Sequence, residues 1–351
     1  MLRAGGSALD AAVAGAAVLA VVEPNMGQLG GDAFMLIFLG STGRVVAINA
    51  NGPAPRGARP ELFSSGIPAT GLRSATVPGV VSGWCTAVSL YGKCTLNQIL
   101  QPAIEYAADG FPVPPRLSRE LERLAPLYAA CPASAEIFLP DGASPRPGQV
   151  LIQRDLARSL GIIADSGADA FYRGDIARAI SRYAAEDGGL LAREDLTDFR
   201  CEVQTPLSTE YRGSRINVNP LMSPGFGVLQ ALNIVEGFDL AGLGGGSAEA
   251  VHLLVEACRL VASDRERHVG DPRFVAVPLE RLLSREHAAA QRSVIHPDRV
   301  AAEPGTDRAP EGDGGETTCL VAADGEGTVV AYIHSLFAGS GVTVPGTGIL
   351  L

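Results

Sequence analysis

The chain has 351 residues, of which 46% are apolar, so it is long enough to bury a substantial core in one large or two ordinary domains. Acidic residues outnumber basic residues by 38 to 28, and the net charge of −10 argues against nucleic acid or an anionic membrane as the main partner. A small molecule is the expected partner.

The first predicted element is an apolar helix that begins after Ser7 and ends before Pro24. Serine is a favourable N-cap residue, and proline cannot continue a helix. Because this helix is apolar on nearly all sides, it is expected to pack against a sheet. Its apolar run is shorter than the ~20 residues that span a bilayer as a helix, and no export signal is recognisable, so a cytoplasmic location is expected.

Two hairpins are predicted, one near each end of the chain. Residues 35–39 and 44–49 flank one Gly-rich turn, and residues 319–324 and 328–333 flank another.

Helices are predicted between the two hairpins. The helical pattern covers much of residues 95–190, and further helices fit residues 193–200 and 247–269. This order favours an α/β fold of the α+β type, in which helices cover antiparallel sheets, over alternating strand–helix units.

The sequence gives no indication of a metal or an organic cofactor. The six cysteines are widely scattered, without the spacing of a zinc or redox site. Asp264 and His268 have metal-ligand spacing on a helix, but two ligands without a third seldom bind a metal tightly. We therefore expect neither a metal nor a cofactor.

An adjacent pair of threonines, Thr317 and Thr318, follows a segment over residues 298–316 that is poor in large apolar residues and is predicted to be an exposed flexible linker. If the bond between Glu316 and Thr317 were broken, the new α-amino group would have a pKa near 7.7–8.0 and could act as a base for its own hydroxyl. The alternative is that threonine stands there for its strand propensity alone.

Segments in the same order along nearly the whole chain resemble the γ-glutamyltransferase (glutathione hydrolase) family of N-terminal-nucleophile hydrolases. They include GGSALDAAVAGAAVLAVVEP, GQLGGDAFML, TVPGVVSGW, LQPAIEYAADGFPV and GGETTCLVAADGEGTVVAYIHSLFAGSG. The resemblance implies a four-layer αββα sandwich, with two packed antiparallel sheets between helical layers. It also implies self-cleavage at the Glu316–Thr317 bond, with Thr317 as the nucleophile.

The resemblance suggests further site residues close to the nucleophile. Ser335 stands where the family commonly has a threonine that hydrogen-bonds to the nucleophile and assists processing; the other interpretation is a strand serine that faces a neighbour. Gly339 and Gly341 match the family's tight Gly-rich loop beside the site.

Two positions depart from the pattern of the γ-glutamyl enzymes. Asn51 stands where those enzymes have an arginine that grips the α-carboxylate of the substrate, and Phe337 replaces a polar contact on the same side. These changes resemble the divergent bacterial branch of the family, which includes hydrolases of small amides such as oxamate.

The sequence therefore predicts a self-processing threonine amidohydrolase or acyltransferase. Residues 1–316 correspond to the large subunit and residues 317–351 to the start of the small subunit, and the chain resembles a C-terminally truncated member. Its substrate would be a γ-glutamyl compound or similar amide, with water or an amine as acceptor. A same-mechanism amidase with a non-glutamyl substrate and a catalytically incompetent fragment remain as alternatives. Because relatives are often exported, a periplasmic location also remains open.

Overall fold

The computed structural model describes residues 1–300, 316–337 and 339–351, and within them the chain forms two compact units. The first comprises Met1–Arg44, Ile48–Val203 and the described residues after 315. The second comprises Val45–Ala47 and the described residues of 204–312. Most of the linker predicted over residues 298–316 lies outside the described residues.

The first unit combines a sheet with a group of helices. Its helices are α1 (Ala8–Val22), α2 (Val80–Tyr91), α3 (Leu96–Asp109), α4 (Pro115–Ala129), α5 (Pro132–Phe138), α6 (Arg154–Tyr172), α7 (Asp175–Glu186) and α8 (Arg193–Asp198). Its strands are β1 (Asp32–Leu39), β2 (Arg44–Ala50), β3 (Phe111–Pro112), β4 (Val150–Leu151), β5 (Glu202–Gln204), β8 (Glu316–Ala323), β9 (Val329–Phe337), β10 (Thr343–Val344) and β11 (Ile349–Leu350).

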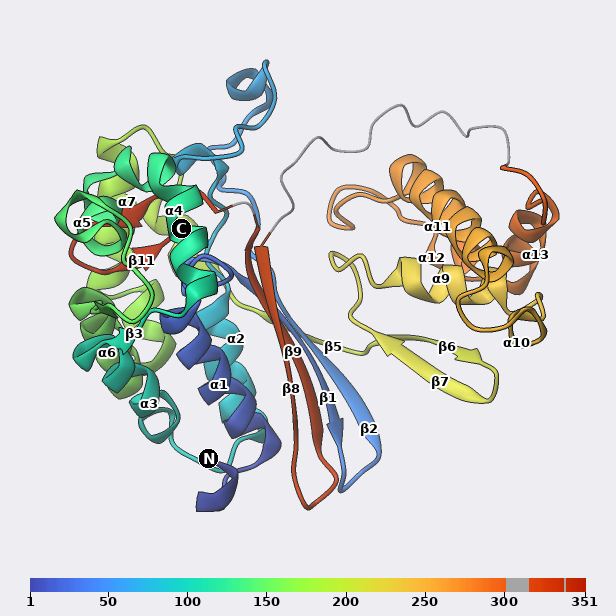
Figure 1. The fold of residues 1–351 in the computed structure, drawn as a ribbon, viewed down its shortest axis with the longest axis horizontal. Coiled ribbons are helices and arrows are strands. Elements are labelled where there is room, and N and C mark those ends of the chain that lie inside the picture. The colour runs from blue at the N-terminus through green and yellow to red at the C-terminus, as the bar shows by residue number, and fades with distance from the viewer. Residues whose placement is uncertain (301–315, 338) are drawn as a thin grey trace. The chain divides into compact units, whose positions relative to one another are not determined.

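The main sheet has five strands in the order β5-β2-β1-β9-β8 (Figure 1). Strand β9 pairs antiparallel with both β1 and β8, so the two ends of the chain meet in one sheet. Both predicted hairpins are confirmed, and each is longer than predicted. The α/β class with a mostly antiparallel sheet is confirmed as well.

Helices α1 and α2 pack on one face of this sheet, and Figure 1 shows both on the same side of it. The predicted helix after Ser7 is confirmed as α1. Ser7 and Asp10 form a capping box at its start, and the side chain of Trp84 on α2 donates a 2.8 Å hydrogen bond to the Tyr332 hydroxyl on β9. These contacts anchor the inner face of the sheet to the helices.

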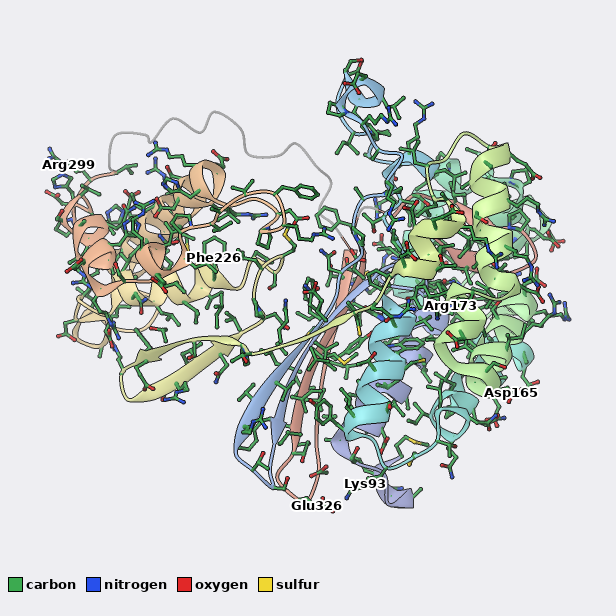
Figure 2. The ribbon with its side chains drawn as sticks, turned by 180° about the vertical axis from the view of Figure 1, so that it is seen from behind. Lys93, Asp165, Arg173, Phe226, Arg299 and Glu326 are labelled. Carbon is green, nitrogen blue, oxygen red and sulfur yellow. The ribbon has the colours of Figure 1, made fainter. Side chains whose placement is uncertain are left out.

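A buried carboxylate ties the start of α1 to the loop between α2 and α3. Asp10 is fully buried and accepts hydrogen bonds from the backbone and hydroxyl of Ser7, at 2.7 and 2.8 Å. It also accepts from the backbone N–H groups of Lys93 and Cys94. The side chain of Lys93 forms an ion pair with Glu326 in the β8–β9 turn, where Figure 2 labels both residues.

The opposite face of the sheet exposes a row of apolar side chains. Strand register places Ile333 between Phe34 and Cys319, and Val329 between Phe38 and Ala323. Four of these side chains on the face are exposed by a third or more: Phe38 by 39%, Val321 by 67%, Val329 by 38% and Ile333 by 41%.

The second unit has a small core of its own, formed by helices against a hairpin. Its elements are β6 (Leu207–Tyr211), β7 (Ser214–Val218), α9 (Phe226–Val235), α10 (Leu240–Leu243), α11 (Ala248–His268), α12 (Leu279–Leu282) and α13 (Arg285–Ser293). Helix α11 confirms the helix predicted over residues 247–269. No helix in the described part of either unit is long and apolar enough to cross a membrane.

Candidate functional site

The two adjacent threonines at the start of β8 point to opposite faces of the sheet. Successive strand residues alternate in direction, so Thr317 is exposed on the outer face whereas Thr318 is buried. The hydroxyl of Thr318 donates a long 3.4 Å hydrogen bond to Glu23 at the end of α1. Of the pair, only Thr317 presents its hydroxyl to the side on which a substrate could approach.

The hydroxyl of Thr317 lies 2.9 Å from that of Ser335, which faces it from β9. The Ser335 hydroxyl oxygen also accepts a 2.8 Å hydrogen bond from the backbone N–H of Phe337. The predicted hydrogen bond between Thr317 and Ser335 is thus present in the geometry, and the role of Ser335 in processing stays a prediction.

A β-bulge lies beside this pair. Glu316 is opposite Phe337 whereas Thr317 is opposite Ser335, so Leu336 is the additional residue on β9. Phe337 has a positive φ of 59°, a conformation that non-glycine residues rarely adopt and that is common at functional sites. The bulge turns the Phe337 N–H towards the Ser335 hydroxyl.

A pocket of about 490 Å³ opens next to Ser335. Residues from five stretches of the chain line it: Gly30, Gly31, Asp32, Asn51, Ile67, Pro68, Ala69, Ser74, Ala75, Thr76, Ser335, Leu336, Phe337, Gly339, Ser340 and Leu351. This volume is within the range of small-molecule sites. Four residues that the sequence singled out therefore come together around one cavity: Asn51, Ser335, Phe337 and Gly339.

The glycines of the following loop take positive φ angles, 67° at Gly339 and 76° at Gly341, as a tight loop requires. Gly339 lines the pocket, whereas Gly341 is buried below it, where a Cβ atom would lie 2.3 Å from the Leu127 side chain. Close packing against Leu127 thus requires a glycine at position 341, and a substrate-binding role of Gly341 stays a prediction.

Asp32 is a pocket residue that the sequence analysis missed. It begins β1, directly opposite Ser335, and its Oδ1 accepts a 2.9 Å hydrogen bond from the backbone N–H of Gly52. Burial raises the pKa of this carboxyl to about 7, and the Gly52 N–H opposes the rise. The signal in the sequence is an acid in the Gly-Gly-Asp segment just before an apolar strand.

His334 is the histidine next to this site in the sequence, but it points into the core. Only 1% of its surface is exposed, burial lowers its pKa to about 4, and its Nδ1 lies 3.4 Å from the Tyr332 hydroxyl. It is therefore neutral and on the face opposite to Thr317, so it is not placed to act as a base for that hydroxyl.

No third possible metal ligand joins the helical pair Asp264 and His268 among the described residues. Asp264 instead lies 2.6 Å from the Nε2 of His287 on α13 and accepts a 3.0 Å hydrogen bond from Gln291. Within the described residues, no group of three or more possible metal-binding side chains is found.

The model of one protein family, described as Gamma-glutamyltranspeptidase, matches residues 1–351. The chain is 38% identical over 356 residues to the glutathione hydrolase-like YwrD proenzyme of Bacillus subtilis (strain 168), and 38% identical over 367 residues to the acylase ACY 1 proenzyme of Pseudomonas sp. (strain SE83). Both alignments cover 100% of this chain, together with 67% and 65% of the respective relative.

Among solved structures, the cephalosporin acylase from Bacillus halodurans matches with a TM-score of 0.90 and 35% identity. This match covers 100% of the present chain and 65% of the acylase chain. The chain thus spans about two thirds of the length of the curated relatives it matches.

Proposed function

The chain belongs to the gamma-glutamyltranspeptidase family, and from this premise we propose that it is a self-processing amide hydrolase or acyltransferase with Thr317 as its nucleophile. The observation that carries the proposal is the 2.9 Å contact between the Thr317 and Ser335 hydroxyls at the exposed start of β8. Neither a metal nor an organic cofactor takes part in the proposed chemistry.

Processing begins with Thr317. Its hydroxyl oxygen attacks the carbonyl carbon of Glu316, the peptide C–N bond breaks, and the acyl group moves from nitrogen to oxygen as an ester. The shift leaves the α-amino group of Thr317 free, and water then hydrolyses the ester, which releases the Thr317 hydroxyl and a carboxylate on Glu316. Residues 1–316 and 317–351 become the large-subunit region and the start of the small subunit.

Turnover uses the two groups that processing leaves on Thr317. The neutral α-amino group takes the proton of the hydroxyl as the oxygen attacks the substrate amide, and it then passes that proton to the departing amine. The acyl-enzyme ester is resolved by water or by an acceptor amine. Ser335 is placed to hold the Thr317 hydroxyl in position during both reactions.

Two candidate substrates follow from the pocket. One is a γ-glutamyl amide. The other is a non-glutamyl amide, which is favoured because Asn51 and Phe337 line the pocket and none of its described lining residues is basic. An α-carboxylate would find no cation there, and the acylase relatives fit this second candidate.

We also propose that the exposed apolar face of the sheet is the face on which a second sheet packs in a four-layer αββα sandwich. Four exposed apolar side chains on strands β1, β8 and β9 would be buried by a second sheet packed on this face. Thr317 is the second residue of β8, so this second sheet would also border the nucleophile.

Substitution of Thr317 tests the proposal on a denaturing gel. The parent protein is expected to yield two fragments, the smaller of which begins TTCLV by mass spectrometry. Thr317→Ala is expected to remain a single chain because it lacks the hydroxyl, whereas Thr317→Ser keeps the hydroxyl and is expected to be cleaved.

Ser335→Ala tests the supporting hydroxyl in the same experiment. It is expected to slow cleavage by about tenfold or more, because a hydrogen bond to the reacting oxygen is lost. Ser335→Thr retains a hydroxyl and should restore most of the rate, and Ser181→Ala on helix α7 is the matched control. A parent protein that stays intact under all conditions would identify this chain as a catalytically incompetent fragment.

A further inference from the structure

Asp32 is the charged side chain among the residues that line the pocket. The other lining side chains are aliphatic, aromatic, hydroxyl-bearing or amide-bearing, or belong to glycine. Asp32 makes one hydrogen bond, with the Gly52 N–H, and no ion pair within the described part of the chain. Its carboxyl group therefore faces a ligand space without a protein cation to neutralise it.

The register of the sheet sets the distance between Asp32 and the nucleophile. Asp32 is opposite Ser335, and Ser335 is opposite Thr317, so the three residues form one row across β1, β9 and β8. Neighbouring strands are about 4.8 Å apart, which places Asp32 roughly 10 Å from Thr317 along this row. An acyl group bound at Thr317 with a short arm directed across Ser335 would end near Asp32.

The basic residue that follows Asn51 most closely in the sequence does not line the pocket. The Arg56 guanidinium forms a 2.8 Å ion pair with Asp198 at the end of α8, and both side chains are more than half exposed. A carboxylate at the end of the acyl arm would therefore face Asp32 without a compensating cation. An ammonium or another N–H donor would find a carboxyl acceptor.

We propose that Asp32 is a specificity-determining residue, which selects acyl groups with an amino group at the end of a short arm and rejects those that end in a carboxylate. This inference rests on the proposed function, because it takes the acyl carbonyl to be bound at Thr317. It narrows the non-glutamyl candidate to amides of amino-terminated acyl groups.

Binding of three matched amides tests the inference without need for turnover. The ligands are 4-aminobutanamide, 4-carboxybutanamide and butanamide, titrated into the full chain at about pH 8 and followed by ligand-observed NMR. The amino ligand is expected to bind at least about tenfold more tightly than either of the others. Equal affinities for the three ligands would overturn the inference.

Two substitutions in the pocket sharpen this test. Asp32→Asn retains an acceptor for the Gly52 N–H but removes the negative charge. It should lower the affinity of the amino ligand to that of butanamide. The affinity of the carboxylate ligand should rise. Asn51→Arg should favour the carboxylate ligand because it adds a cation to the same pocket. Asp165→Asn removes the same charge from α6, at the site labelled in Figure 2, and should leave all three affinities unchanged.

p-Nitroanilides with the same three acyl arms separate this inference from the proposed function. If nitroaniline is released fastest from the amino-terminated substrate, the result supports both the proposed hydrolase and the role of Asp32. Turnover without preference among the three arms overturns the role of Asp32 and supports the hydrolase. Absence of turnover overturns the hydrolase, and the binding titration still decides whether Asp32 selects amino groups.

Discussion

The hydroxyls of Thr317 and Ser335 are neighbours because antiparallel strands place them directly opposite one another. Their partner across the next strand is Asp32, whose carboxyl lies at the edge of the pocket. A hydroxyl pair and a carboxyl thus occupy one row of the sheet, and the next row on the same face, Phe34, Ile333 and Cys319, is apolar. This arrangement separates the reacting oxygen of Thr317 from the Asp32 carboxyl, which we propose selects the end of the acyl group.

Asp32 should make the stability of the first unit depend on pH. Burial raises the pKa of its carboxyl from 3.8 to about 7, so the folded state binds this proton more tightly than the unfolded state. The stabilising contribution is therefore fully present below pH ~4 and is lost as the pH rises to about 7. At roughly 1.4 kcal/mol per pKa unit, about 2–3 kcal/mol is expected to disappear between pH 5 and pH 8.

Urea unfolding of the parent and of Asp32→Asn at several pH values measures this loss. Trp84 is the single tryptophan and is buried in the first unit, so its fluorescence reports the unit that contains Asp32. The difference in unfolding free energy between the two proteins should change by about the stated amount. A difference that is constant from pH 5 to pH 8 would contradict the raised pKa.

At the scale of elements, local patterns predicted α1, the hairpins and α11, because caps, turns and periodicity are encoded within short segments. The row formed by Asp32, Ser335 and Thr317 could not be predicted in this way. Asp32 and Ser335 are separated by almost the whole chain, and only the register between β1 and β9 brings them together. Thr317 and Ser335 could be named as candidate site residues from the sequence because a family resemblance, rather than the local pattern, pointed to them.

The Asp264–His268 spacing illustrates the same limit. Both residues lie on α11 as expected, but the partner of Asp264 is His287, which comes from α13. The spacing of residues along the sequence shows which side chains of one helix can contact each other. It does not indicate which other helix will supply a closer partner.

Among the polar contacts between elements of the first unit, those of Asp10 at the start of α1 should cost the most stability when they are removed. Asp10→Ala would leave the buried or partly buried N–H groups of Ser7, Lys93 and Cys94 without their acceptor. We expect a loss of roughly 3 kcal/mol or more, compared with about 1 kcal/mol for Ser7→Ala, which removes only the N-cap hydroxyl.

Trp84 fluorescence during urea unfolding compares these two variants. Thr95→Ala, which alters the exposed cap of α3, is the matched control and should cost no more than Ser7→Ala. If Asp10→Ala were no more destabilising than Ser7→Ala, the junction between α1 and the α2–α3 loop would contribute little.

At the scale of the whole molecule, the outer face of the sheet is a large apolar surface next to the nucleophile. Exposed surfaces of this kind commonly bind another layer of protein. We expect the 351-residue chain to bind the dye ANS, and the double substitution Val321→Lys with Val329→Lys to reduce that binding by about half, because both side chains are exposed on this face.

Leu62→Lys provides the control for this experiment. Leu62 is 42% exposed in a short helical turn over residues 60–63, which belongs to no strand of the sheet. It should leave dye binding nearly unchanged. Equal dye binding by the parent and the double variant would argue against the sheet face as the inner boundary of a further layer.

Close backbone contacts around the pocket limit how this protein could be re-engineered. A Cβ atom at Gly31 would lie 2.1 Å from the Ser335 carbonyl oxygen, and one at Gly52 would lie 1.6 Å from the carbonyl oxygen of Val77. Saturation libraries directed at these glycines would yield mostly misfolded protein. The segment over residues 67–76 contributes side chains to the same pocket, so diversity introduced there offers a practical route to new acyl preferences.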